Sequence, residues 1–395
     1  MSGVSSVQAQ SYSSGSTGAD GAFNLTTTGT VLFNPPNMIP PIHPTISNVF
    51  NFTTINIASG VTLQVSGGIF QAPVYWLATG AVEIDGIVDL SGAPGHAGGI
   101  SLAQRVPSLP GAGGYPGGVG GWAGNNQAMP ESGGGPGGGA PGSGANTNGT
   151  SATYTGGQDP IPILGGSGGG GGNCAGTGTF AGGGGAGGGA LIIASNVSIT
   201  VKGSILAPGG NGGYVPCQYG GSGGGGVIRL VAPVVTTAGS LSVKGGTSQD
   251  TAASGIARLE YFQGSIGGSI SGTYVTSIPF PALAPTTVPS AIQVTSIAGT
   301  PVNANPFTFP NSTITTTAPV AVVIGAQYVP TGTVSTLYVF SDSGSDQVIP
   351  VPALAGTLAS STATVNVSFP PGASYGYVKA VWNNGPITNV ATTTH

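Results

Sequence analysis

PVYWLATGAVEIDGIVDLSG (residues 73–92) and ALIIASNVSITVKGSILAPG (residues 190–209) are two versions of one pattern. Each begins with a short apolar run, turns a corner of small residues, and continues as an alternating run that ends at a glycine. Between the two copies, 39 of the chain's 76 glycines fall in residues 91–190. The glycines therefore interrupt a repeat, and a repeat determines the architecture of a whole domain.

Three further segments fit the same pattern, at residues 54–67, 227–245 and, in degenerate form, 256–272. Val, Ile, Leu and Thr alternate with small polar residues in these copies, and no segment shows a sustained 3.6-residue apolar period. One such unit cannot bury its own apolar face, whereas stacked units can. The sequence predicts an all-β protein built from stacked coils of short strands.

The pattern resembles right-handed parallel β-helices of the pectate-lyase-like fold, which occur in many secreted bacterial surface proteins. The resemblance covers roughly residues 24–272 and implies a parallel β-helix (solenoid) over residues 23–275. Residues 93–189 and 210–225 would then be glycine-rich loop insertions at the corners of coils. The resemblance carries no catalytic residue across.

The remaining chain divides by composition. Residues 1–22 are rich in Ser and Gly and predict a flexible N-terminal arm. Residues 276–289 contain regularly spaced prolines and predict a linker. Residues 290–395 contain several alternating apolar runs in about 100 residues, which is the size of an immunoglobulin-like β-sandwich.

Charge is scarce, and this excludes several classes of partner. Only 4% of residues are charged, the net charge is −4, and Lys and Arg together number six. No basic surface for nucleic acid can be built from so few cations. No run of 18 apolar residues occurs, so no membrane insertion is expected. Low charge also lets copies of the chain approach one another, which favours a homopolymer.

Cys174 and Cys217 are the only cysteines. An even number in an apparently exported protein predicts a disulfide between them, and the alternative is two free thiols. We expect a secreted or cell-surface protein with no cofactor and no metal site, since no Cys/His cluster occurs. Six Asn-x-Ser/Thr sequons permit glycosylation without arguing for it; they lie at Asn24, Asn51, Asn148, Asn196, Asn311 and Asn366.

Glu83, Asp85 and Asp89 form the one cluster of acids that could carry chemistry. Glu83 and Asp85 are two residues apart on a predicted strand and so share a face. Paired acids of this kind cut polysaccharides in glycosidases. The favoured alternative is a solvated outer face that limits aggregation of a sheet, so we do not expect an enzyme.

Five aromatic residues are spaced along the predicted insertions; they are Tyr115, Trp122, Tyr154, Tyr214 and Tyr219. If exposed, they could contact a ligand or another subunit, and otherwise they would pack on the glycines. The glycines lack the strict three-residue register of collagen. They could instead form extended polyproline-II-like segments joined by backbone hydrogen bonds, as in the glycine-rich tips of some phage tail adhesins, or form a mobile linker.

These observations favour an extracellular structural protein, a subunit of a self-assembling fibre or an adhesive surface layer that has no enzymatic activity. Its expected partner is itself, with surface polysaccharide as a further candidate. A polysaccharide lyase or hydrolase using Glu83, Asp85 and Asp89 is one alternative. A glycan-binding adhesin or tail-fibre tip that uses the aromatics is another.

Overall fold

The computed structural model describes residues 12–43, 47–99, 105–122, 129–154, 163–175, 179–214, 217–279, 291–302, 312–341, 347–372 and 374–380. The chain divides into two units, Met1–Thr287 and Val288–His395, and each is described by itself. Strands account for almost all regular structure in the described ranges, where the one helical turn is a 3-10 turn at Pro35–Asn37. The prediction of an all-β class is confirmed.

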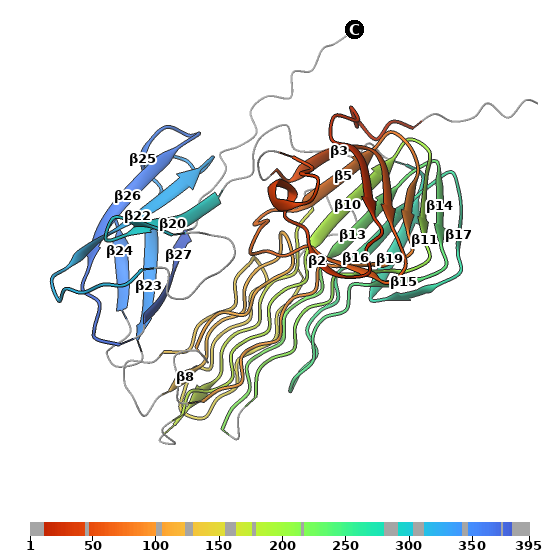
Figure 1. Ribbon diagram of the computed structural model, residues 1–395. Coiled ribbons are helices and arrows are strands. Elements are labelled where there is room, and N and C mark those ends of the chain that lie inside the picture. Colours follow the sequence, from red (N-terminus) through yellow and green to blue (C-terminus); the bar gives the residue numbers. More distant parts are fainter. Residues whose placement is uncertain are drawn as a thin grey trace, which may run out of the picture. The chain divides into compact units, whose positions relative to one another are not determined.

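Parallel strands build the first unit (Figure 1). They are β1 (Gly21–Leu25), β2 (Gly29–Leu32), β3 (Val49–Ile57), β4 (Val61–Gln64), β5 (Val74–Ala78), β6 (Val82–Ile84), β7 (Ile87–Asp89), β8 (Gly121–Trp122), β9 (Asn173–Cys174), β10 (Ala190–Ser195), β11 (Ser198–Val201), β12 (Ser204–Leu206), β13 (Val227–Val231), β14 (Val234–Thr237), β15 (Ser240–Ser242), β16 (Ile256–Glu260), β17 (Gln263–Ile266), β18 (Ser269–Ser271) and β19 (Thr273–Ser277).

Successive copies of the sequence pattern pair strand by strand. The first strands β5, β10, β13 and β16 form one parallel ladder, β6, β11, β14 and β17 form a second, and β7, β12, β15 and β18 a third. The first two ladders are joined through β3 into an 11-stranded sheet, and the third belongs to a six-stranded sheet. The sheets curl around a shared interior in Figure 1.

The interior is filled by alternate residues of these strands, as the period-two pattern predicts. Val82 and Ile84 are fully buried, whereas Glu83 between them is exposed. Toward the N-terminal strands the core is aromatic, and Trp76 lies edge-on to Phe23 and Phe33 at 5.9 and 5.4 Å between ring centroids. The apolar side chains therefore bury themselves against equivalent positions in the neighbouring repeats.

Residues 12–20, which the sequence suggests as part of a flexible arm, pack against the first unit. Ser14 is 1% exposed, its hydroxyl donates to the carbonyl of Ala78 at 2.8 Å, and its N–H donates to Asn196 Oδ1 at 2.7 Å. The Ser-rich composition suggested flexibility, but here the serine hydroxyls satisfy polar groups at a turn of the sheet.

The glycine-rich insertions are ordered in the described residues. Extended segments run side by side away from the sheets (Figure 1), and we call residues 90–99, 105–122, 129–154, 163–175, 179–190, 207–214 and 217–226 the glycine bundle. The chain leaves for it after β7 and again after β12, at the same corner of successive repeats. A third, shorter excursion follows β15 at residues 243–255, where the sequence pattern predicted no insertion.

Residues 179–190 lie at the centre of the bundle, and their N–H groups donate to three neighbouring segments in rotation. Successive N–H groups from Ala181 to Gly189 donate to the carbonyls of Gly121, Gln218, His96, Gly118, Gly221, Ala93, Tyr115, Gly224 and Leu90. Every third residue therefore meets the same neighbouring segment. A period of three is that of polyproline II, so the N–H groups point in three directions. Carbonyls of the same run accept from further segments, for example Gly182 from Gly172 N–H and Gly183 from Gly213 N–H.

Close backbone approach explains why these positions are glycine. A Cβ atom on Gly187 would lie 1.8 Å from the carbonyl oxygen of Gly166, and one on Gly184 would lie 1.9 Å from that of Gly169. Segments at this spacing satisfy each other's peptide groups without side chains. The glycines are thus held in place by a lattice of backbone bonds that the repeats anchor.

The second unit consists of two antiparallel sheets. One holds β20 (Ala291–Ile297), β21 (Thr300–Pro301), β22 (Val320–Gln327), β25 (Ala355–Gly356) and β26 (Ser361–Val367), and the other holds β23 (Ser335–Ser341), β24 (Gln347–Val351) and β27 (Ser374–Ala380). Val322 and Ile324 from the first sheet share one buried cluster with Leu337 and Val339 from the second.

Candidate functional site

The three candidate acids lie on neighbouring strands, and two of them are engaged. Asp85 follows β6 and pairs with Lys202 at 3.3 Å between Oδ1 and Nζ. Asp89 Oδ1 accepts hydrogen bonds from the N–H and the hydroxyl of Ser91. Glu83 is exposed. The aligned repeats place Lys202 opposite Asp85, so an alignment of the repeats predicts this ion pair.

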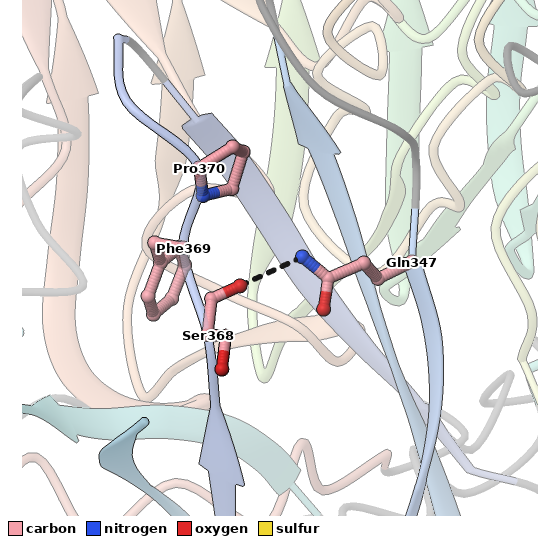
Figure 2. A pocket seen from close by; sticks show the side chains of 4 residues that line it. All are labelled: Gln347, Ser368, Phe369 and Pro370. Carbon is pink, nitrogen blue, oxygen red and sulfur yellow. Dashed lines mark hydrogen bonds between the residues drawn. The ribbon is translucent and has the colours of Figure 1, made fainter. Parts of the chain in front are cut away.

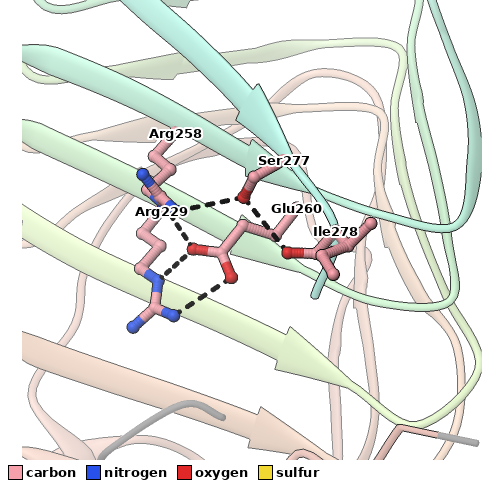
Figure 3. Close-up of polar contacts among 5 residues, drawn as sticks. All are labelled: Arg229, Arg258, Glu260, Ser277 and Ile278. Carbon is pink, nitrogen blue, oxygen red and sulfur yellow. Dashed lines mark hydrogen bonds and ion pairs between the residues drawn. The ribbon is translucent and has the colours of Figure 1, made fainter. Parts of the chain in front are cut away.

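A buried ionic cluster was not predicted from the sequence. Glu260 is fully buried and receives two hydrogen bonds from Arg229, at 2.8 and 3.2 Å, and one from Arg258 Nε at 2.7 Å (Figure 3). Arg258 also donates to the Ser277 hydroxyl at 3.0 Å. These residues lie on β13, β16 and β19, where the parallel register sets Arg229 beside Arg258. The Glu260 carboxylate meets both guanidinium groups, as a structural ion cluster requires.

The candidate aromatics lie in different surroundings. Trp122 meets Phe180 edge-on at 6.0 Å, and Tyr154 packs against a cluster on the outer side of β5 and β10. Burial raises the pKa of Tyr115 and of Tyr154 above that of an exposed phenol. Trp122, Tyr115 and Tyr154 are thus half-buried packing residues of the bundle.

Tyr214 and Tyr219 differ from the other aromatics. Their rings stack with centroids 4.3 Å apart and planes inclined by 28°. Tyr214 is 51% exposed, whereas Tyr219 is half-buried. The structure therefore brings together two of the five candidate aromatics at the surface.

The predicted disulfide is confirmed between Cys174 and Cys217. It joins β9 to the first residue of the segment 217–226, so it ties two excursions of the glycine bundle together. Beside it, Asn146 Oδ1 accepts from the N–H of Ala175 at 2.8 Å, and Asn148 Oδ1 accepts from the N–H of Tyr219 at 3.0 Å.

The sequon asparagines differ in exposure. Asn24, Asn148 and Asn366 are exposed, Asn51 and Asn196 are half-buried, and Asn311 lies outside the described residues. The Oδ1 atoms of Asn51 and Asn196 accept backbone hydrogen bonds from Thr17 and Ser14. These two side chains thus already hold residues 12–20 in place.

In the second unit, a shallow depression is lined by Gln347, Ser368, Phe369 and Pro370 (Figure 2). Gln347 Nε2 donates to the carbonyl of Ser368 at 2.9 Å across it. The polar side chains that line it are the Gln347 amide and the Ser368 hydroxyl, and none of the four lining residues is an acid or a base.

In the described ranges, no group of three or more His, Cys, Asp or Glu side chains could hold a metal ion. Within the same ranges no helix is long and apolar enough to cross a membrane. Comparison with known proteins found no matching family model, no matching curated protein and no matching solved structure. The function must therefore be argued from the structure itself.

Proposed function

We propose that this chain is an exported structural protein without enzymatic activity, whose copies assemble into a fibre or an adhesive surface layer. In this proposal the first unit is a right-handed parallel β-helix of the pectate-lyase-like kind, and the second is an immunoglobulin-like sandwich. The disulfide supports an oxidising, extracellular location. Assembly proceeds through the strands that end the stack of repeats.

The edge formed by β17, β18 and β19 carries the proposal; it has no further partner among the described strands, and we call it the open edge. β17 and β19 are the two end strands of the 11-stranded sheet, and β18 ends the six-stranded sheet. The carbonyl of Ser277 accepts from Tyr261 N–H at 3.0 Å. Because alternate residues of a strand direct their peptide groups to opposite neighbours, those of Tyr274 and Thr276 face the open edge.

This edge lacks the charged residues and prolines that often prevent strand addition. Residues 263–277 contain no Asp, Glu, Lys, Arg or Pro. Monomeric proteins protect edge strands with charged residues, prolines or covering segments, because unpaired N–H and C=O groups recruit another chain. An uncharged edge is therefore suited to pairing with a second copy.

The opposite end of the stack provides the complementary edge. β1 pairs with β3 alone and β2 with β4 alone, so each leaves one side unpaired among the described strands. All ladders of the first unit named above are parallel, and a copy added head to tail would continue them in the same direction. A head-to-tail contact leaves the new end open, so assembly propagates as a filament.

Light scattering and negative-stain electron microscopy over a concentration series test assembly. We expect filaments whose onset shifts about tenfold higher in concentration in Tyr274→Lys, because the added charge lies on the open edge. Val197→Lys is the matched control: Val197 is 50% exposed and Tyr274 51%, but Val197 lies at an inner repeat. A wild-type protein that stays monomeric throughout the series would overturn the proposal.

A further inference from the structure

The end of the glycine bundle remote from the sheets carries a fixed aromatic surface. Gly220 N–H donates to the Gly213 carbonyl at 2.9 Å, and Gly213 N–H donates to that of Gly183 at 2.8 Å. These bonds hold the backbone immediately beside Tyr214 and Tyr219. One face of the Tyr214 ring is occupied by Tyr219, so its 51% exposure leaves the opposite face to solvent.

Two exposed asparagines lie beside this pair, and each is held through the oxygen of its side-chain amide. Backbone N–H groups of Ala175 and Tyr219 donate to the Oδ1 atoms of Asn146 and Asn148, which also identifies those atoms as oxygen. Their Nδ2 groups make no hydrogen bond within the described part of the chain. Two donors are thus oriented and available to a ligand.

The segments that carry these four residues are cross-linked and uncharged. The disulfide at Cys217 lies between the two asparagine-bearing contacts, because Cys217 Sγ is 3.6 Å from Asn146 Oδ1 and Tyr219 follows two residues later. Residues 132–157 and 203–226 contain no charged side chain. Rigidity lowers the entropy lost on binding, and neutrality favours an uncharged ligand.

We infer that Tyr214, Tyr219, Asn146 and Asn148 form a binding site for a neutral saccharide. The C–H face of a sugar ring stacks on the open face of Tyr214, and the two Nδ2 groups donate to sugar hydroxyls. An aromatic ring with a few fixed polar groups is the chemistry that recognises such a ligand. This site is separate from the open edge of the repeats, so it goes beyond the proposed function.

Affinity gel electrophoresis of the full chain tests this inference, with mannan, dextran, galactan and a soluble β-glucan as probes and heparin as a polyanion control. We expect at least one neutral polysaccharide to retard the protein, and heparin not to. Tyr214→Ala should weaken retardation about tenfold, whereas Tyr214→Phe should retain it because the ring is kept. Mobilities are referred to a gel without polysaccharide.

Two further variants sharpen the test. Asn148→Asp keeps an oxygen acceptor for the Tyr219 N–H but removes the Nδ2 donors, so it should weaken binding while the disulfide and the melting temperature stay unchanged. Tyr274→Ala is the matched control, since Tyr274 is exposed to the same 51% on the open edge. It should leave saccharide binding unchanged.

Substitutions at Tyr214 and Tyr274 separate this inference from the proposed function. Tyr214→Ala should leave filament formation intact, and Tyr274→Lys should leave retardation intact at concentrations below assembly. Retardation by none of the four neutral polysaccharides would overturn the inference. Equal retardation of wild type and Tyr214→Ala would also overturn it.

Discussion

Single glycines differ sharply in what they contribute to the bundle, even within one segment. Gly187 and Gly183 both lie in the central run of residues 179–190 and both are buried. A Cβ atom on Gly187 would lie 1.8 Å from the Gly166 oxygen, whereas the nearest atom to one on Gly183 would be 3.4 Å away. Composition alone cannot distinguish the two positions, because the difference depends on which neighbour passes by.

We expect Gly187→Ala to lower the free energy of unfolding by about 1–3 kcal/mol, because the neighbouring backbone must move to admit the methyl group. Gly183→Ala should change it by less than about 1 kcal/mol, since alanine fits there and restricts the unfolded chain. Chemical denaturation monitored by circular dichroism measures both. Equal losses in the two variants would contradict the close packing described for the bundle.

At the scale of elements, the ladder β5, β10, β13 and β16 is buried on both faces. Ile228 and Leu230 of β13 face the core, while Val227 and Val231 belong to a second cluster on the other side. Continuous apolar runs are typical of parallel strands covered on both faces. Arg229 and Glu260 lie between the residues of that second side and interrupt its apolar surface with an ion pair.

Glu260→Ala should therefore lower the free energy of unfolding by about 3–5 kcal/mol, because it leaves two arginines beside a site without their carboxylate. Glu83→Ala is the control, since this acid is exposed on β6 and its loss should cost less than about 0.5 kcal/mol. Thermal and urea unfolding measure both. Glu83→Ala would also abolish turnover if the acid cluster were catalytic, which the proposed function does not expect.

At the scale of the whole molecule, the chain comprises two units with separate cores. Both cysteines belong to the first unit, and their disulfide closes a loop with a sequence separation of 43. A closed loop of this size restricts the unfolded chain of that unit alone. The two units should accordingly respond differently to reduction.

Calorimetry of the intact protein should show two transitions. Cys174→Ser with Cys217→Ser should lower only the transition of the first unit, by about 2–4 kcal/mol. The second unit contains no cysteine and serves as the internal control. A shift of both transitions together would show that the units unfold cooperatively.

The sequence by itself determined the all-β class, the repeat and the cysteine pair. These follow from local information: a period of two, copies that align, and two cysteines with only each other as partners. The aligned copies even contained the Asp85–Lys202 pair. The β-helix, the immunoglobulin-like sandwich and the assembly function stay predictions.

Only the tertiary structure decided which carbonyl each glycine N–H meets, that Arg229 and Arg258 share Glu260, and that Tyr214 stacks on Tyr219 beside two asparagines. These contacts join segments that are far apart in the chain. A glycine has no side chain, so the sequence of a glycine run contains no pattern that indicates which segment it will contact. The physical reason is that each glycine's partner depends on how far neighbouring segments are shifted along one another. The repeats that anchor the segments set that shift.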